Sequence, residues 1–298
     1  MIDQATGRDG SFERTASTPP FVSGLSPIEL RRLASLDEYR QCEELQARVW
    51  GPDDVVRVPA LVMVTAGLNG GYAFGAFAGE RIVGFVLASP GLTEAGRVKQ
   101  CSILMAVDAA YQNNGVGHRL KMAQRETALA QGIDLITWTF DPLASANVHL
   151  NLHKLGCVAS RYFVDVYGTP ERGLNAGLPS DRLLAEWWIR KPRVPIAPPA
   201  AAPVVGEVEP DPQSCLPVLH DADLSRRESV LLVEIPESIR AIKLADLELA
   251  VRWRLGLREI LQHYFAQGYC AAGFHRLPGE DRVRHCILLE RLDGPEAI

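Results

Sequence analysis

The sequence has no long apolar run and no closely spaced cysteine pair, and each absence excludes a class of protein. Without a run of about 18 apolar residues, no membrane-spanning helix is predicted. The polar N-terminal segment lacks the apolar stretch of a signal peptide, so we expect a cytoplasmic protein. The six cysteines are scattered without a C-x-x-C pair, which argues against a zinc site or a disulfide framework.

An excess of basic residues is also missing. The chain carries 31 Lys and Arg residues against 36 Asp and Glu residues, a formal net charge of −5 with neutral histidines. We therefore expect neither nucleic acid nor a membrane as partner, and an anionic ligand must be held by local geometry. Hydrophobic residues make up 47% of the 298 residues, which is enough for a buried core.

Composition divides the chain into four segments. Residues 1–24 are rich in Ser, Thr, Gly and Pro, and we expect them to be flexible. Residues 191–221 contain too many prolines for a helix or a central strand, which predicts a linker or a surface arm. The core is then expected at 25–190, and a tail at 222–298 is expected to pack on it or to add strands to its sheet.

Hydrophobic periodicity predicts alternating strands and helices in the core, in the order β–α–α–β–β–β–α–β–α–β. The strands are expected at 28–36, 71–77, 82–89, 100–107, 133–140 and 158–167, and the helices at 36–50, 59–68, 116–131 and 147–155. A hairpin followed by a βαβ unit indicates an α/β sheet with helices on both faces, in which strands 100–107 and 133–140 are parallel neighbours. The tail predicts strands at 229–235, 269–275 and 285–292 and one helix at 239–267.

The most informative segment follows a predicted buried strand and opens a predicted helix. Its turn reads Gln112-Asn-Asn-Gly-Val-Gly117, and the two glycines let an anion approach the backbone closely. The free N–H groups and the dipole of a helix N-terminus favour a phosphate there. Three interpretations are open: a tight turn without ligand, a dinucleotide site, or a site for the pyrophosphate of coenzyme A. The absence of G-x-G-x-x-G disfavours the dinucleotide.

In this turn and in its order of elements the sequence resembles the GNAT superfamily of N-acetyltransferases. The family signature [RQ]-x-x-G-x-[GA] is matched by Gln112, Gly115 and Gly117. The segments WTFDPLASANVHLNLHKLG and LNAGLPSDRLLAEW resemble a narrower group of predicted GNAT acetyltransferases with unassigned substrate. The resemblance implies a GNAT-type α/β fold, with a mixed, mostly antiparallel sheet and helices on both faces, to which the tail adds a strand–helix–strand–strand extension.

The resemblance also implies a site for acetyl-CoA, or another acyl-CoA, as acyl donor. The end of the fourth strand would pair with the pantetheine arm, and an N–H near residues 104–106 would hold the developing oxyanion. Asn147 resembles the family Asn that contacts the pantetheine. The implied cofactor-binding residues are therefore Met105, Ala106, Val107, Gln112, Asn113, Asn114, Gly115, Val116, Gly117, His118 and Asn147.

The sequence departs from the family at the usual proton donor. The family often has N-x-x-A-x-x-x-Y, but counting back from Gly156 places Leu152 at the Tyr position and Ser145 at the Asn position. The leaving thiolate would be protonated by Tyr162 or by a water, or would leave without help. Asp141, at the end of the fifth strand, is the candidate that binds the substrate ammonium or removes its proton; its alternative role is to cap a turn.

The expected activity is transfer of an acetyl or short acyl group to a primary amine of a small molecule, by direct attack in a ternary complex. No metal is expected, because His149 and His153 lack the adjacent Glu of hydrolytic zinc sites. A non-catalytic acyl-CoA sensor or scaffold is the alternative from another class, and an enzyme for longer acyl-CoA is a third. The acceptor and the oligomeric state stay open, a homodimer included.

Overall fold

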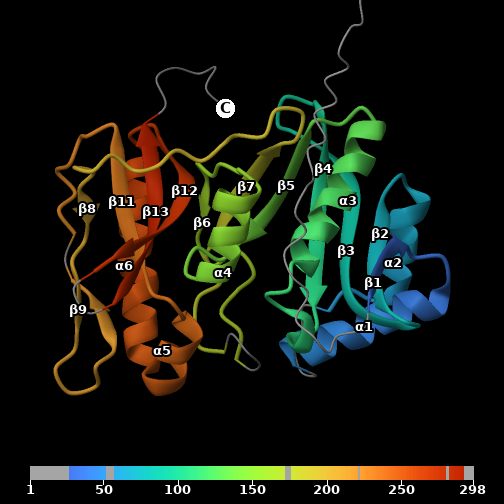
Figure 1. The fold of residues 1–298 in the computed structure, drawn as a ribbon, viewed down its shortest axis with the longest axis horizontal. Helices are drawn as coiled ribbons and strands as arrows, with labels where there is room; N and C mark the ends of the chain where they lie inside the picture. Colours follow the sequence, from blue (N-terminus) through green and yellow to red (C-terminus); the bar gives the residue numbers. More distant parts are fainter. Residues whose placement is uncertain (1–26, 52–56, 172–175, 221, 280–281, 292–298) are drawn as a thin grey trace, which may run out of the picture.

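The computed structural model describes residues 27–51, 57–171, 176–220, 222–279 and 282–291. These residues form two principal sheets that lie side by side, with helices packed on them (Figure 1). The segment 1–24, for which we predict flexibility, lies outside the described residues. Across the described part of the chain, no helix is both long enough and apolar enough to cross a lipid bilayer.

The first sheet has seven strands and is mostly antiparallel. Its order is β1-β2-β3-β4-β5-β7-β6, and only β4 and β5 pair in parallel. The strands are β1 (Ile28–Arg32), β2 (Tyr72–Ala78), β3 (Arg81–Leu92), β4 (Val98–Val107), β5 (Leu135–Phe140), β6 (Tyr162–Phe163) and β7 (Arg182–Trp188).

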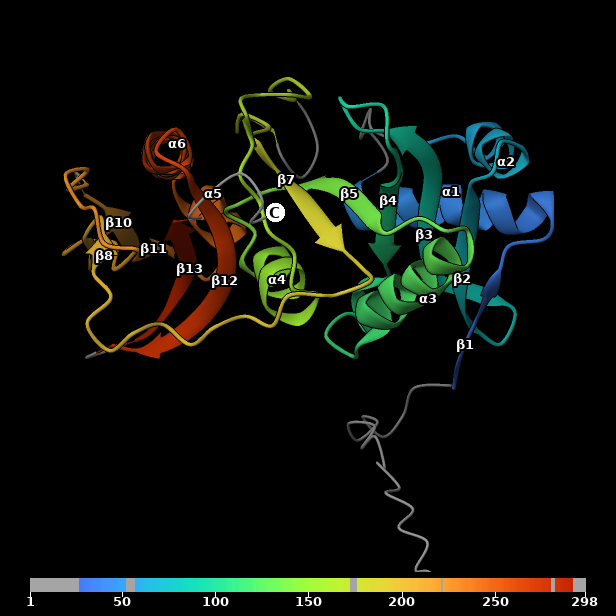
Figure 2. The same cartoon turned by 90° about the horizontal axis from the view of Figure 1, so that it is seen from above.

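Helices cover both faces of this sheet. Figure 2 shows α1 (Leu36–Trp50) and α2 (Ala60–Leu68) on one face and α3 (Val116–Ala130) on the other. The alternation of side chains along β3 fits this arrangement, because Phe85 packs in the apolar cluster under α1 while Val86 packs under α3. A capping box starts α1, in which Ser35 and Glu38 satisfy each other's backbone N–H groups.

The second sheet belongs to the C-terminal part of the chain. Its order is β12-β13-β11-β8. Its elements are β8 (Val204–Val205), β11 (Val230–Ile235), β12 (Tyr269–Pro278) and β13 (Val283–Arg291), with the helices α5 (Ile239–Ala245) and α6 (Leu247–Phe265). A separate two-stranded ribbon is formed by β9 (Val208–Pro210) and β10 (Pro217–Leu219). The tail therefore contains the predicted strands, and β8–β10 fall within the Pro-rich segment 191–221.

A short stretch of backbone before β6 connects the two sheets. Val158 exchanges hydrogen bonds of 3.1 and 2.9 Å with Glu186 of β7, and Ala159 exchanges bonds of 2.9 and 2.8 Å with Ala271 of β12. The largest apolar cluster follows the same path, since it includes Ile136 of β5 as well as Trp253 of α6. The tail strands thus form a sheet of their own rather than extending the seven-stranded sheet, and this stretch of backbone and the shared apolar cluster join the two.

Most predicted elements are confirmed, including the hairpin of β2 with β3 and the parallel pairing of β4 with β5. The single helix expected at 239–267 is wrong, because Asp246 adopts an extended conformation (φ −152°, ψ 102°) and caps α6. The strand expected at 158–167 is also wrong for most of its length: Asp165 has a positive φ of 43° and turns the chain. The helix expected at 147–155 is α4 (Ser145–Val148) continued by η2 (His149–Lys154).

Candidate functional site

The two central strands of the first sheet separate part-way along their length. β4 and β5 pair only at Gln100 with Ile136 and at Cys101 with Thr137. Just beyond, Ile103 forms a β-bulge, because Ser102 and Leu104 pair with consecutive residues of β3 and leave Ile103 unpaired. A bulge bends a strand. Past this point the edge of β4 that faces β5 has no strand beside it, and we call this opening the splay.

The splay opens into a cavity of about 470 Å³. Its walls include residues 102–105 of β4, residues 138–141 at the end of β5, Trp50 of α1, and residues of α4 and α5. Two of the predicted cofactor-binding residues, Met105 and Asn147, line it. The cavity therefore joins the splay to the C-terminal extension.

The predicted anion turn lies where β4 ends. The side-chain amide of Gln112 donates to the carbonyl oxygen of Val107 at 2.9 Å, so this strand oxygen is used by the turn. Asn113 and Gly115 have positive φ values of 61° and 77°, which bend the chain into α3. No side chain caps the first turn of α3, whose first backbone bond runs from Arg119 to Gly115. Uncapped amides at a helix N-terminus suit a phosphate.

The remaining predicted cofactor-binding residues divide between core and surface. Ala106 and Val116 are buried in the apolar clusters. Asn114 is exposed, and His118 is half-buried with a pKa lowered by burial. Backbone groups of these residues could contact a ligand, whereas the two buried side chains serve packing.

Lys121 of α3 is a wall residue that the sequence analysis does not single out. Its side chain is 2% exposed, and its Nζ donates to Ser102 Oγ at 2.7 Å and to Gln124 Oε1 at 3.2 Å. The ammonium lies 3.5 Å from the ring centroid of Trp138. None of the described carboxylates forms an ion pair with it. Burial lowers the pKa of Lys121 to about 7, so it can both give and take a proton near neutral pH.

Polar contacts hold the partner of this lysine in place. Gln124 donates to Gln100 Oε1 at 3.0 Å, and the hydroxyl of Tyr72 donates to the same oxygen at 2.7 Å. The network links α3 to β2 and β4 at the closed end of the splay. Helical periodicity could have placed Lys121 on the buried face of α3, and this is the sequence feature by which it could have been found.

Asp141 lines the cavity, but its carboxylate is already occupied. Arg254 of α6 donates to both oxygens at 2.7 Å, and the backbone N–H of Leu143 donates at 2.8 Å. The side chain of Arg254 is 1% exposed, so this ion pair is largely shielded from water. Both oxygens are thus engaged within the protein, which disfavours the predicted role as base.

Tyr162 is not among the residues that line the cavity. Its hydroxyl donates to Asp181 at 2.6 Å, and Arg258 donates to both oxygens of the same carboxylate. Burial, followed by the bond to Asp181, raises the pKa of Tyr162 and makes it a poorer acid. The catalytic roles of Asp141 and Tyr162 stay predictions, and their contacts speak against both.

The positions that carry Asn and Tyr in the family motif are occupied differently. Leu152 is fully buried, and Ser145 Oγ lies 2.9 Å from Nδ1 of His285. The rings of His149 and His153 are stacked with centroids 5.1 Å apart. No group of three or more His, Cys, Asp or Glu side chains could hold a metal within the described ranges.

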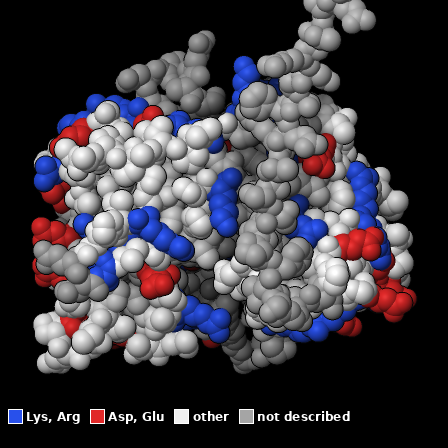
Figure 3. Space-filling view, viewed as in Figure 1, with Lys and Arg blue, Asp and Glu red and all other residues white. Residues whose placement is uncertain are grey.

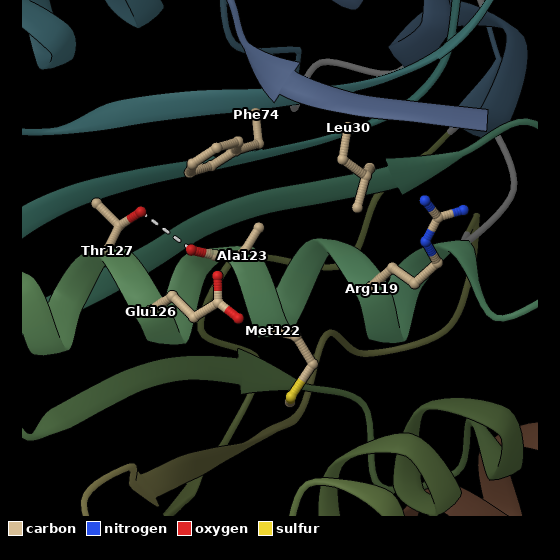
Figure 4. Close-up of a pocket in the computed structure, with 7 residues that line it drawn as sticks. All are labelled: Leu30, Phe74, Arg119, Met122, Ala123, Glu126 and Thr127. Atoms are coloured by element: carbon tan, nitrogen blue, oxygen red, sulfur yellow. Dashed lines mark hydrogen bonds between the residues drawn. The ribbon is translucent and has the colours of Figure 1, made fainter. Parts of the chain in front are cut away.

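A second cavity, of about 410 Å³, lies between α3 and the first two strands. Figure 4 shows Leu30 and Phe74 pointing from the strands toward the helix. Two polar side chains of this cavity are engaged within the protein: Thr127 donates to the carbonyl of Ala123 at 3.0 Å, and Arg119 donates to the carbonyl of Ile28 at 3.0 Å. The splay cavity is therefore the better candidate for chemistry.

Comparison with known families agrees with this geometry. Residues 35–156 match the sequence model of the Acetyltransferase (GNAT) family. The chain contains a GNAT acetyltransferase domain. The matched segment includes β4 with its bulge, the turn at 112–118, Lys121 and Asp141, whereas Arg254 and α5 lie outside it. The domain is that of an N-acetyltransferase with unassigned substrate, and the mixed, mostly antiparallel sheet is the GNAT fold expected from the sequence.

Three solved structures are similar to about half of the chain. The ribosomal-protein-S18-alanine N-acetyltransferase of Escherichia coli is 13% identical, with 55% of this chain and 94% of that one covered and a TM-score of 0.43. A GNAT acetyltransferase of Streptococcus pneumoniae is 18% identical, with 54% and 98% covered and a TM-score of 0.43. Arabidopsis thaliana Naa50, bound to the bisubstrate analogue CoA-Ac-MVNAL, is 16% identical, with 53% and 97% covered and a TM-score of 0.43. No curated protein sequence matches the chain.

Proposed function

We propose that the protein transfers an acetyl or other short acyl group from coenzyme A to a primary amine of a small molecule, in the cytoplasm. The observation that supports this best is the splay beside the uncapped N-terminus of α3, within the GNAT segment. The amides of residues 116–118 would hold the pyrophosphate. The edge of residues 105–107, apart from the Val107 carbonyl that accepts from Gln112, would pair with the pantetheine arm.

The reaction needs only the two substrates. The neutral amine attacks the thioester carbonyl in a ternary complex, a C–N bond forms, and the C–S bond breaks. The nitrogen loses a proton and the sulfur gains one, so that charge and atoms balance. N–H groups on the free edge of β4 near Ile103 and Leu104 would hydrogen-bond the carbonyl oxygen as negative charge develops on it.

In this proposal Lys121 delivers the proton to sulfur, because Leu152 stands where the family has Tyr. Its Nζ lies against Ser102, one residue before the bulge that carries the oxyanion contacts. A lysine that titrates near pH 7 can protonate the thiolate and recover a proton from the attacking nitrogen through water.

Kinetics of Lys121→Met test this role. The variant should lose about 10²- to 10⁴-fold in kcat, as expected for loss of an acid–base group, with little change in the affinity for coenzyme A. The exposed Lys191→Met is the control and should keep its kcat. An acetyl thioester of an arylthiol, which leaves without protonation, should restore the rate of Lys121→Met. Absence of this rescue would mean that Lys121 does not act as the acid.

The donor site is tested with two matched glycine variants. Gly115 and Gly132 flank the same helix with φ values of 77° and 75°, and a Cβ at either would meet no atom within 4 Å. Leucine at either position therefore imposes a similar backbone strain, about 1–2 kcal/mol. Gly115→Leu should raise the Kd for coenzyme A at least tenfold by calorimetry, while Gly132→Leu leaves it unchanged. Equal affinities would contradict a pyrophosphate at this turn.

Turnover is tested by following free thiol with acetyl-CoA and a panel of amines. Thiol release that depends on the amine supports the transferase. Coenzyme A binding without thiol release for any amine would favour a non-catalytic sensor or scaffold, an alternative that the leucine at position 152 supports. Release with longer acyl-CoA alone would assign a different acyl donor.

A further inference from the structure

The cavity wall beyond the splay is formed by the C-terminal extension and is rich in positive charge. Five basic side chains line the cavity, against Asp141 as the acidic one: Lys121, Arg182, Arg240, Lys243 and Arg254. The whole chain has the opposite sign, with a formal net charge of −5. On the face drawn in Figure 3, basic and acidic side chains are interspersed without a broad patch of one sign. The positive charge of the cavity is thus a local feature.

The carboxylate of Asp141 is used mainly by one of these groups, Arg254. Asp141 accepts two bonds of 2.7 Å from Arg254, and Arg182 is more distant, at 4.0 Å from the same carboxylate. Arg182 donates instead to the backbone oxygen of Asp181 at 2.8 Å. Arg240 is exposed and makes no ion pair or side-chain hydrogen bond with any described residue. The guanidinium of Arg240, and those N–H groups of Arg182 that donate to no described residue, are therefore available to an anion.

Arg240 lies on the side of the sheets opposite the proposed donor site at α3. Figure 2 shows α5 and α6 on the side where α1 and α2 lie, with α3 on the other. Trp50 of α1 and Arg240 of α5 line the same cavity. Since the donor pyrophosphate is assigned to the N-terminus of α3, the amine has to approach from the opposite face. Arg240 is then placed to contact the acceptor rather than the donor.

We infer that the acceptor is an amine that also carries a carboxylate, which Arg182 and Arg240 bind as the amine points into the splay. The inference rests on the proposed transferase function and names its substrate class. A guanidinium binds a carboxylate through parallel N–H bonds with defined geometry. A phosphate is also an anion that guanidinium groups bind, and the experiment below distinguishes a phosphate from a carboxylate. The extension outside the GNAT segment would thereby set substrate specificity.

Four amines of similar size test the inference: an amino acid, its carboxamide, the amine without the carboxyl group, and an aminoalkyl phosphate. We expect kcat/KM to be at least tenfold higher for the amino acid than for the two uncharged analogues, as expected for a charge-assisted contact. Arg240→Gln should remove most of this preference through KM. Arg252→Gln, on the exposed face of α6 and outside the cavity wall, should retain it.

The outcomes separate the inference from the proposed function. Equal kcat/KM for all four amines would overturn the inference and leave the transferase intact, and a preference for the aminoalkyl phosphate would overturn the carboxylate. A raised Kd for coenzyme A in Arg240→Gln, with an unchanged KM for the amino acid, would also overturn it. If no amine turns over, the fluorescence of Trp50 and Trp138 reports binding to the coenzyme A complex. If the amino acid binds and Arg240→Gln weakens that binding, the carboxylate site is supported even without turnover. If the amino acid does not bind, or binds equally well to Arg240→Gln, the inference is overturned.

Discussion

Lys121→Met should stabilise the folded protein at neutral pH, and the stabilisation should fade as the pH rises. Burial lowers the pKa of Lys121 from 10.5 to about 7. In the unfolded chain the lysine keeps the higher pKa, so below pH 7 folding carries the full cost of burying the ammonium. Between pH 7 and 10.5 the folded state is neutral while the unfolded state still binds the proton, and the cost declines with rising pH. Above pH 10.5 no cost remains.

The magnitude follows from the pKa difference and from the contacts that the substitution removes. The difference of 10.5 minus 7, about 3.5 units, corresponds to about 5 kcal/mol at 1.36 kcal/mol per unit. Methionine leaves Ser102 Oγ and Gln124 Oε1 without their donor, which costs about 1–3 kcal/mol. It also loses the contact of the ammonium with Trp138, about 1 kcal/mol. The expected net stabilisation at pH 7 is about 1–3 kcal/mol.

Urea unfolding of both proteins at intervals from pH 6.5 to 9.5 measures this effect. The free-energy advantage of Lys121→Met should be constant below pH 7 and should then shrink by up to about 1.4 kcal/mol per pH unit. The exposed Lys191→Met should show no such trend. A variant that is less stable than the parent at pH 7, by an amount independent of pH, would refute the argument that this lysine is held at a cost in stability.

Two further predictions concern the C-terminal helices. Asp141→Asn removes the carboxylate that balances the buried guanidinium of Arg254, so the free energy of unfolding should fall by about 3–5 kcal/mol in urea titrations. The double variant Asp141→Asn with Arg254→Met should recover most of this loss. If Asp141→Asn alone leaves the free energy of unfolding unchanged, the ion pair is not formed in solution. Asp246→Ala removes the side chain that caps Leu249 at 2.8 Å and should lower stability by about 1 kcal/mol, whereas Asp246→Asn should be nearly neutral; equal losses in both variants would argue against the cap.

Local patterns were enough to predict elements whose signals lie close together in the chain. Helix α1 is found at the predicted residues, because its apolar period and its cap at Ser35 act within one helical turn. The turn at 112–117 was identifiable because its glycines adjoin a strand and a helix. The sequence analysis missed β7, although Leu183, Ala185 and Trp187 alternate inward as the strand pattern requires.

The chemistry of the site depends on contacts between distant residues. Lys121 is unusual because of Trp138 and Ser102, which come from two other elements, and no local spacing reveals that environment. Asp141 was a reasonable candidate base by position, but its partner Arg254 lies 113 residues further along the chain. Prediction of the break at Asp246 required weighing a capping residue against a continuous apolar period.

The backbone contacts of Val158 and Ala159 have a consequence for any attempt to divide the protein. A sheet edge with unpaired N–H and C=O groups tends to associate with other chains. In this molecule β12 pairs with part of the edge on which a free-standing first sheet would end, through Ala271 and Ala159. A fragment truncated near residue 190 would expose that edge and part of the shared apolar core together, so we expect it to aggregate rather than to behave as a smaller enzyme.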